Sequence, residues 1–176
     1  MVAEPERNLI SLLFFLYKEC GRSCFLVSFK CSDGWVLRSM IVGYILETSH
    51  GLLIYDKFFN VKPSIDTHLV ASAFNSICLF TKEILNEPVE EILTNGSRIV
   101  VAHDGNVMLS IISQNTSAMA KQLAKKFVKL FSKKLQTEDK CIVVCDALIS
   151  KIKDELDELD REIIEINENY KHQSYV

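Results

Sequence analysis

The sequence lacks any apolar run long enough to cross a membrane. A bilayer span needs about 20 consecutive apolar residues, and no segment of the 176 approaches that length. The longest apolar run, Leu9 to Tyr17, has the length of a signal-peptide core, but Glu4 and Glu6 precede it and no small-x-small cleavage site follows. We therefore interpret this run as part of a short helix and expect a cytoplasmic protein.

The sequence also lacks the motifs of common enzyme and nucleic-acid-binding classes. No P-loop, Gly-x-Ser-x-Gly elbow or His-Glu-x-x-His motif occurs, and only four histidines are present. The formal net charge of −3 argues against a nucleic-acid binder, because such domains are usually basic. We predict a non-enzymatic protein with no catalytic residues, no cofactor and no metal, although a small enzyme with an unfamiliar site remains a third possibility.

The six cysteines do not indicate a disulfide scaffold, because a chain with 48% hydrophobic residues can build a core without cross-links. Cys78 lies within an apolar helical pattern and suits a reducing compartment. The alternative is a zinc or redox site, since two pairs have a spacing of four residues and Cys31 lies near the first. Those pairs are Cys20 with Cys24 and Cys141 with Cys145. Structural zinc sites prefer a two-residue gap, so inert thiols are the favoured interpretation.

From residue 40 onward, the hydrophobic pattern indicates a series of strands and helices. It predicts strands at 41–46 and 52–59, a helix over 66–86, strands at 89–93, 98–102 and 106–113, and helices over 117–135 and about 146–170. Asn95-Gly96 and Asp104-Gly105 predict tight hairpins, because type I′ turns need positive φ at both central residues. Ser64 or Asp66 is a candidate N-cap for the first long helix.

Residues 1–39 are harder to interpret. They suggest a short helix over 8–19, followed by apolar runs at 23–30 and 35–38 around Ser32-Asp33-Gly34. This segment could add a hairpin to the edge of the sheet, form an interaction appendage, or lie upstream of a true start at Met40. We divide the chain into an N-terminal appendage, 1–39, and a domain, 40–176.

The order of elements over about residues 40–170 resembles the longin domain. The opening Met40-Ile-Val-Gly-Tyr-Ile-Leu, the turn into Leu-Leu-Ile-Tyr-Asp56 and the helix Leu69-Val-Ala-Ser-Ala-Phe-Asn-Ser-Ile77 look like longin and adaptor small-chain sequences. The sibling roadblock fold begins with a helix and lacks a long final helix, so it fits less well. The resemblance implies an α+β fold, order β-β-α-β-β-β-α-α, whose five-stranded antiparallel sheet has one helix on one face and two on the other.

The resemblance further implies a protein–protein interaction module, homo- or heterodimeric, that serves as a platform for a small GTPase or a membrane-trafficking-type complex. Fold alone does not fix function, so this implication is an analogy. The first long helix is apolar over more than half of its circumference and should pack on a sheet and on something else. We predict that it binds the partner through Leu69, Ala73, Phe74, Ile77, Phe80 and Ile84.

The helix over 117–135 carries six lysines and no acid, and its predicted basic face comprises Lys121, Lys125, Lys129 and Lys133. The last helix is rich in acids, so the simplest interpretation is that the two helices complement each other within the fold. Peripheral contact with a membrane or an acidic partner is the alternative. The final helix also has a near-heptad apolar seam, which favours packing on the sheet over a coiled coil with a second chain.

Overall fold

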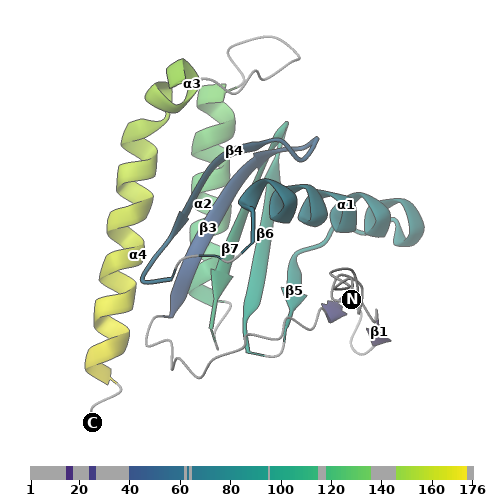
Figure 1. The fold of residues 1–176 in the computed structure, drawn as a ribbon, viewed down its shortest axis with the longest axis horizontal. Helices are drawn as coiled ribbons and strands as arrows, with labels where there is room; N and C mark the ends of the chain where they lie inside the picture. Colours follow the sequence, from purple (N-terminus) through teal and green to yellow (C-terminus); the bar gives the residue numbers. More distant parts are fainter. Residues whose placement is uncertain are drawn as a thin grey trace, which may run out of the picture.

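The computed structural model describes residues 15–17, 24–26, 40–61, 63, 65–94, 96–114, 118–135 and 146–173. Within these residues the chain forms a sheet covered by helices on both faces (Figure 1). The strands are β1 (Phe15–Tyr17), β2 (Cys24–Leu26), β3 (Ile41–Thr48), β4 (Leu53–Phe58), β5 (Glu91–Leu93), β6 (Arg98–Asp104) and β7 (Val107–Ser113). The helices are α1 (Thr67–Leu85), α2 (Ala118–Leu135), α3 (Asp146–Lys151) and α4 (Lys153–Gln173).

Five strands form the antiparallel sheet predicted from the sequence, in the order β5-β6-β7-β3-β4. The central strands β3, β6 and β7 consist largely of buried apolar and β-branched residues, which favours extended backbone packed on both sides. The element order from β3 onward is the predicted β-β-α-β-β-β-α-α, apart from a break near the start of the last helix.

Tight turns connect the hairpins. Thr48 closes the β3–β4 turn, because its hydroxyl oxygen accepts hydrogen bonds from the backbone N–H groups of His50 and Leu52. In the β6–β7 hairpin, Asp104 pairs with Val107, so the two-residue loop is Gly105-Asn106 rather than the predicted Asp104-Gly105. Only Gly105 in that loop has positive φ, whereas a type I′ turn needs it at both positions. The predicted hairpin is confirmed, and its turn type is corrected.

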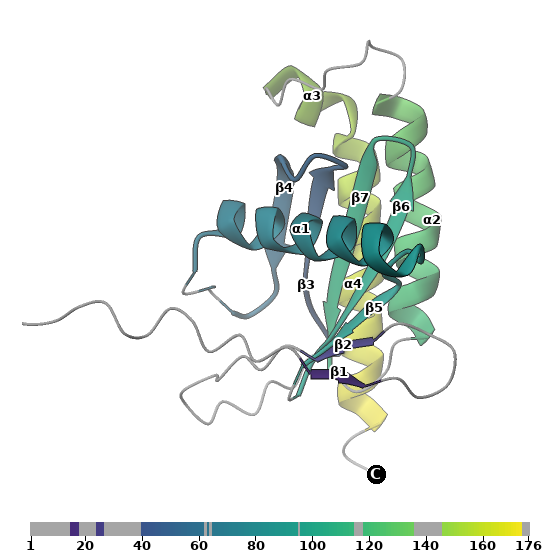
Figure 2. The same ribbon diagram turned by 90° about the vertical axis from the view of Figure 1, so that its right-hand side faces the viewer.

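The two faces of the sheet carry separate cores. Helix α1 crosses one face, while α2 and α4 run along the other, as the two views show (Figures 1 and 2). The core on the α2 and α4 side includes Phe127, Phe131, Leu159 and Ile163. The seam of the last helix is therefore buried within its own chain, which confirms packing on the sheet.

Two side chains of α4 bind it to β3 and β4. The Asn167 amide accepts a hydrogen bond from the Ile41 N–H at 2.8 Å and donates one to the Ile41 carbonyl at 2.9 Å. The Asp160 carboxylate accepts a hydrogen bond from the Tyr44 hydroxyl at 3.0 Å and pairs with the Lys57 ammonium at 2.6 Å. Burial, followed by the charge of Asp160 and this hydrogen bond, raises the pKa of Tyr44.

The final helical segment is not continuous, contrary to the prediction of one helix over 146–170. It turns at Ile152, between α3 and α4. The Ile152 side chain is fully buried, and its backbone N–H donates to the Ile149 carbonyl in a tighter, three-residue turn. No glycine or proline marks the break, and for this reason the sequence pattern did not reveal it.

Part of the N-terminal prediction is wrong. Phe15–Tyr17, predicted as helical, forms strand β1, which pairs antiparallel with β2. Strand β2 in turn pairs parallel with β5 and so extends the sheet beyond its five main strands. Short apolar runs do not distinguish strand from helix by periodicity, which explains the error. The rest of the predicted helix over 8–19 and the run at 35–38 lie outside the described residues, and the division at residue 39 remains a prediction.

Candidate docking surface on α1 and basic face of α2

Helix α1 begins at a well-defined cap. The Asp66 carboxylate accepts a hydrogen bond from the His68 N–H at 2.9 Å, which satisfies one of the free N–H groups of the first turn. Asn86 ends the helix in the left-handed conformation. One of the two predicted N-caps, Asp66, is therefore confirmed, and the helix spans nearly the whole predicted range.

One face of α1 packs on the sheet. Ala71, Phe74 and Cys78 are buried in a core that includes Ile45 of β3, Leu53 of β4 and Met108 of β7. Burial raises the pKa of the Cys78 thiol to about 12, with a smaller effect from the nearby Glu47. Cys78 is therefore a packing residue with little thiolate at neutral pH.

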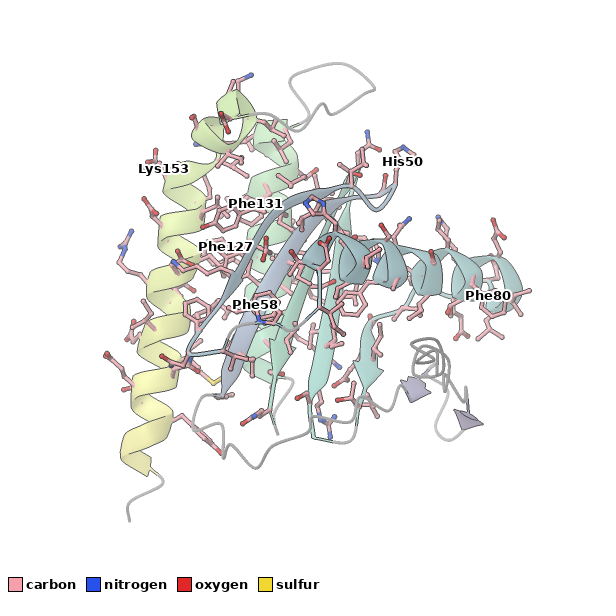
Figure 3. All side chains as sticks on the ribbon, in the orientation of Figure 1. His50, Phe58, Phe80, Phe127, Phe131 and Lys153 are labelled. Carbon is pink, nitrogen blue, oxygen red and sulfur yellow. The ribbon has the colours of Figure 1, made fainter. Side chains whose placement is uncertain are left out.

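The opposite face of α1 is also apolar, but it is exposed. Leu69, Phe80 and Ile84 have 65%, 56% and 64% of their surface accessible. Their spacing of eleven and then four residues places them along one side of the helix, which is centred roughly 130° around the axis from Phe74 and Cys78 at roughly 100° per residue. Figure 3 shows Phe80 near the end of α1 that extends away from α2 and α4. We call Leu69, Ala73, Phe80 and Ile84 the outer face of α1.

The predicted partner-binding residues therefore divide into two groups. Leu69, Ala73, Phe80 and Ile84 come together on the outer face, where all are exposed. Phe74 is only 4% exposed and belongs to the core, and Ile77 is half-buried at the boundary. The sequence pattern combined two apolar stripes because each has helical spacing; only the position of the sheet distinguishes them.

A buried carboxyl group beneath α1 was missed by the sequence pattern. Glu47 on β3 is fully buried between Leu53 of β4 and Met108 of β7, and both of its carboxyl oxygens lack a hydrogen-bond partner among the described residues. Burial raises its pKa to about 8. The Ser110 hydroxyl, two residues along β7 from Met108, is likewise buried and unpartnered within the described segments. The predicted strand stopped at Leu46, so Glu47 was left outside it, whereas β3 continues to Thr48.

The basic face of α2 is only partly neutralised within the fold. Lys121 pairs with Glu91 at 2.9 Å, Lys134 pairs with Glu155 at 2.7 Å, and Lys126 pairs with both Glu158 and Glu162. The predicted complementarity between α2 and α4 is confirmed for Lys126 and Lys134. Lys125, Lys129 and Lys133 are exposed and take part in no ion pair found among the described residues.

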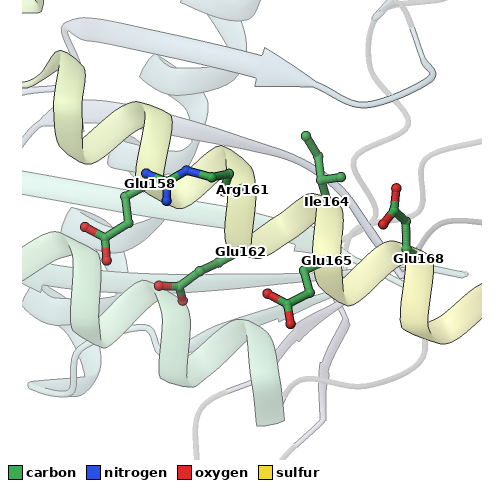
Figure 4. A pocket seen from close by; sticks show the side chains of 6 residues that line it. All are labelled: Glu158, Arg161, Glu162, Ile164, Glu165 and Glu168. Atoms are coloured by element: carbon green, nitrogen blue, oxygen red, sulfur yellow. The ribbon is translucent and has the colours of Figure 1, made fainter.

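The described part of the chain contains no cluster of metal-ligating side chains. No group of three His, Cys, Asp or Glu side chains there could hold a metal ion. A surface hollow is lined entirely by side chains of α4, among them Arg161 and Glu162 (Figure 4). Of the cysteines in the zinc or redox alternative, 20, 31, 141 and 145 lie outside the described residues. Over the same described segments, no helix combines the length and apolarity of a membrane span.

From β3 to α4, the described element order and five-stranded antiparallel sheet are those expected from the sequence. No protein-family model matches the chain, and no curated protein matches its sequence. Solved structures with similar folds include a Roadblock/LC7 domain from Streptomyces avermitilis, with 12% identity and a TM-score of 0.48 over 56% of this chain and 88% of that one.

Two further structures are similar. The gliding protein MglB from Thermus thermophilus has 16% identity and a TM-score of 0.39, over 67% of this chain and 83% of that one. The mammalian SRP receptor has 15% identity and a TM-score of 0.44, over 72% of this chain and 97% of that one. At such low identities and TM-scores, these similarities carry no information about function.

Proposed function

We propose that this chain is a non-enzymatic module that binds another protein through the outer face of α1. The observation that carries the proposal is the exposure of Leu69, Phe80 and Ile84, each more than half accessible, on the side of α1 opposite to the core. Covering apolar surface gains roughly 25 cal/mol per Å², so a row of large exposed apolar side chains favours a partner. Aromatic and aliphatic anchors of this kind dominate the energy of protein interfaces.

The resemblance to longin sequences suggests the class of partner. It implies a small GTPase or a component of a membrane-trafficking-type complex, in a homo- or heterodimer. The two apolar faces of α1 fit such a role, because one face fixes the helix to the sheet and leaves the other for a second chain. Catalysis is not part of the proposal.

The test is quantitative affinity capture with matched variants. Phe80→Ser with Ile84→Ser removes two large apolar side chains from the outer face. The control, Met119→Ser with Ile164→Ser, removes two that are 43% and 45% exposed on α2 and α4. We expect the first pair to lower recovery of a stoichiometric protein partner at least tenfold, because interface anchors contribute about 2 kcal/mol or more each. The control should retain that partner.

Equal recovery with both pairs would contradict the proposal, provided that circular dichroism shows both variants folded. If a small GTPase is among the proteins whose recovery requires Phe80 and Ile84, the proposed class of partner is supported. If a different class of protein binds the same face, the docking surface is supported and the proposal of a GTPase partner is overturned.

A further inference from the structure

The six lysines of α2 differ in what surrounds them. The 18-residue helix contains no acid, so every negative charge near it must come from another element. Glu91 of β5 reaches Lys121, and three glutamates of α4 reach Lys126 and Lys134. Complementarity within the fold therefore accounts for three of the six lysines.

The other three, Lys125, Lys129 and Lys133, follow one another at intervals of four residues and are all exposed. We call them the lysine ridge. Like charges four residues apart on a helix repel each other and destabilise it by a few tenths of a kcal/mol per pair. Lys126 and Lys134, which occur in the same turns, show that α2 can pair its lysines where an acid is placed opposite. The positive charges of the ridge are thus not neutralised by ion pairs inside the described fold.

We propose that the lysine ridge binds the surface of a bilayer containing anionic lipids. Three lysines along the exposed side of a single helix form a convex surface, and the hollow described above is lined by α4 instead. A convex row of charges matches a broad anionic surface better than it matches an extended acidic peptide, which is bound in grooves. Of the large apolar side chains on α2, only Met119 is markedly exposed, so contact is electrostatic adsorption without insertion.

The position of the ridge leaves α1 accessible. Helix α2 and helix α1 cover opposite faces of the sheet (Figure 2). A membrane bound at α2 would therefore leave the outer face of α1 directed away from the bilayer. Membrane binding by the lysine ridge depends on charge and not on the apolar contacts of α1, so its test is independent of the docking surface on α1.

Vesicle co-sedimentation tests the proposal. The probe is vesicles of phosphatidylcholine and phosphatidylserine at roughly two to one, with pure phosphatidylcholine as the neutral reference. Each lysine near an anionic surface is expected to contribute about fivefold in partitioning, so Lys125→Gln, Lys129→Gln and Lys133→Gln together should lower the partition coefficient roughly a hundredfold. Screening should also abolish binding of the unmodified protein at about 1 M salt.

A control with the same change in net charge isolates the role of position. Lys82→Gln, Lys153→Gln and Arg161→Gln remove three exposed positive charges from α1 and α4, and this variant should bind within a few-fold of the unmodified protein. Equal loss of binding in both variants would overturn the proposal, as would no preference for anionic vesicles. Binding to soluble polyglutamate without binding to vesicles would instead assign the ridge to an acidic protein.

Discussion

Glu47 is fully buried beneath α1 without a hydrogen-bond partner for either carboxyl oxygen among the described residues. A buried carboxyl in this situation is held in its neutral form, because the ionised form would lose its hydration without compensation. The groups around it on α1, β4 and β7 are Cys78, Leu53 and Met108, none of which supplies a positive charge. The raised pKa, about 8, therefore follows from burial.

This burial predicts a loss of stability as pH rises. From the ordinary pKa of 4.5 up to about 8, the unfolded chain ionises Glu47 while the folded chain keeps it protonated. The folded state thus binds more protons, and the free energy of unfolding falls by up to about 1.4 kcal/mol per pH unit over that window. Above the folded pKa this contribution becomes constant.

Glu47→Gln should remove that dependence, because the amide keeps the size of the side chain and does not titrate. Urea denaturation of both proteins from about pH 5 to pH 8 measures the difference. We expect the variant to gain a few kcal/mol relative to the unmodified protein across this range. Identical pH slopes for the two proteins would show that Glu47 is hydrated or paired in solution.

The hydrogen bonds of Asn167 lead to a second prediction about stability. Its side chain satisfies both backbone polar groups of Ile41, and it is only 6% exposed. Asn167→Ala would leave a buried N–H and a buried carbonyl unpaired, at a cost of roughly 2–4 kcal/mol in the free energy of unfolding. Asn169→Ala, at an exposed position on the same helix, is the control and should change it by less than about 0.5 kcal/mol. Equal effects of the two substitutions would count against this role for Asn167.

At the scale of elements, α1 is defined by its two apolar faces. Phe74 lies in the core and Phe80 on the outer face, six residues apart. Phe74→Ala should lower the free energy of unfolding by about 3–5 kcal/mol, because it opens a cavity against the sheet. Phe80→Ala should lower it by less than about 1 kcal/mol in the isolated protein. Chemical denaturation of the two variants measures this contrast, and a larger loss from Phe80→Ala would reverse the assignment of the faces.

The elements that the sequence predicted well are those with strong local signals. The glycine-containing turns and the alternation of strands and helices identified β3 to β7, α1 and α2 within a few residues. The break at Ile152 was missed because an apolar residue in heptad register carries no sign of a turn. Strand β1 was missed because a three-residue apolar segment shows no periodicity that distinguishes a strand from a helix.

The candidate site was only partly predictable for a related reason. Both stripes of α1 have helical periodicity, so the sequence located the helix but could not separate Phe74 from Leu69. In the same way, six lysines without an acid predicted a basic face, but the contacts with Glu91 and α4 decide which lysines remain unpaired within the described fold. These distinctions depend on tertiary placement, which local spacing does not contain.

At the scale of the whole molecule, the sheet separates two surfaces of different chemistry. The outer face of α1 is apolar and lies on one side, while the lysine ridge of α2 is cationic and lies on the other. This separation would let one small domain contact a protein and an anionic surface at the same time. In our proposal, the apolar side is an interface with another chain.

Site-specific photo-crosslinking tests that claim most directly. A photoreactive phenylalanine analogue at position 80 lies on the outer face of α1, and the same analogue at position 164 lies at a comparably exposed apolar position on α4. In the native cellular setting, we expect a discrete protein adduct from position 80 and little or none from position 164. Absence of an adduct at position 80, or equal adducts at both positions, would contradict it.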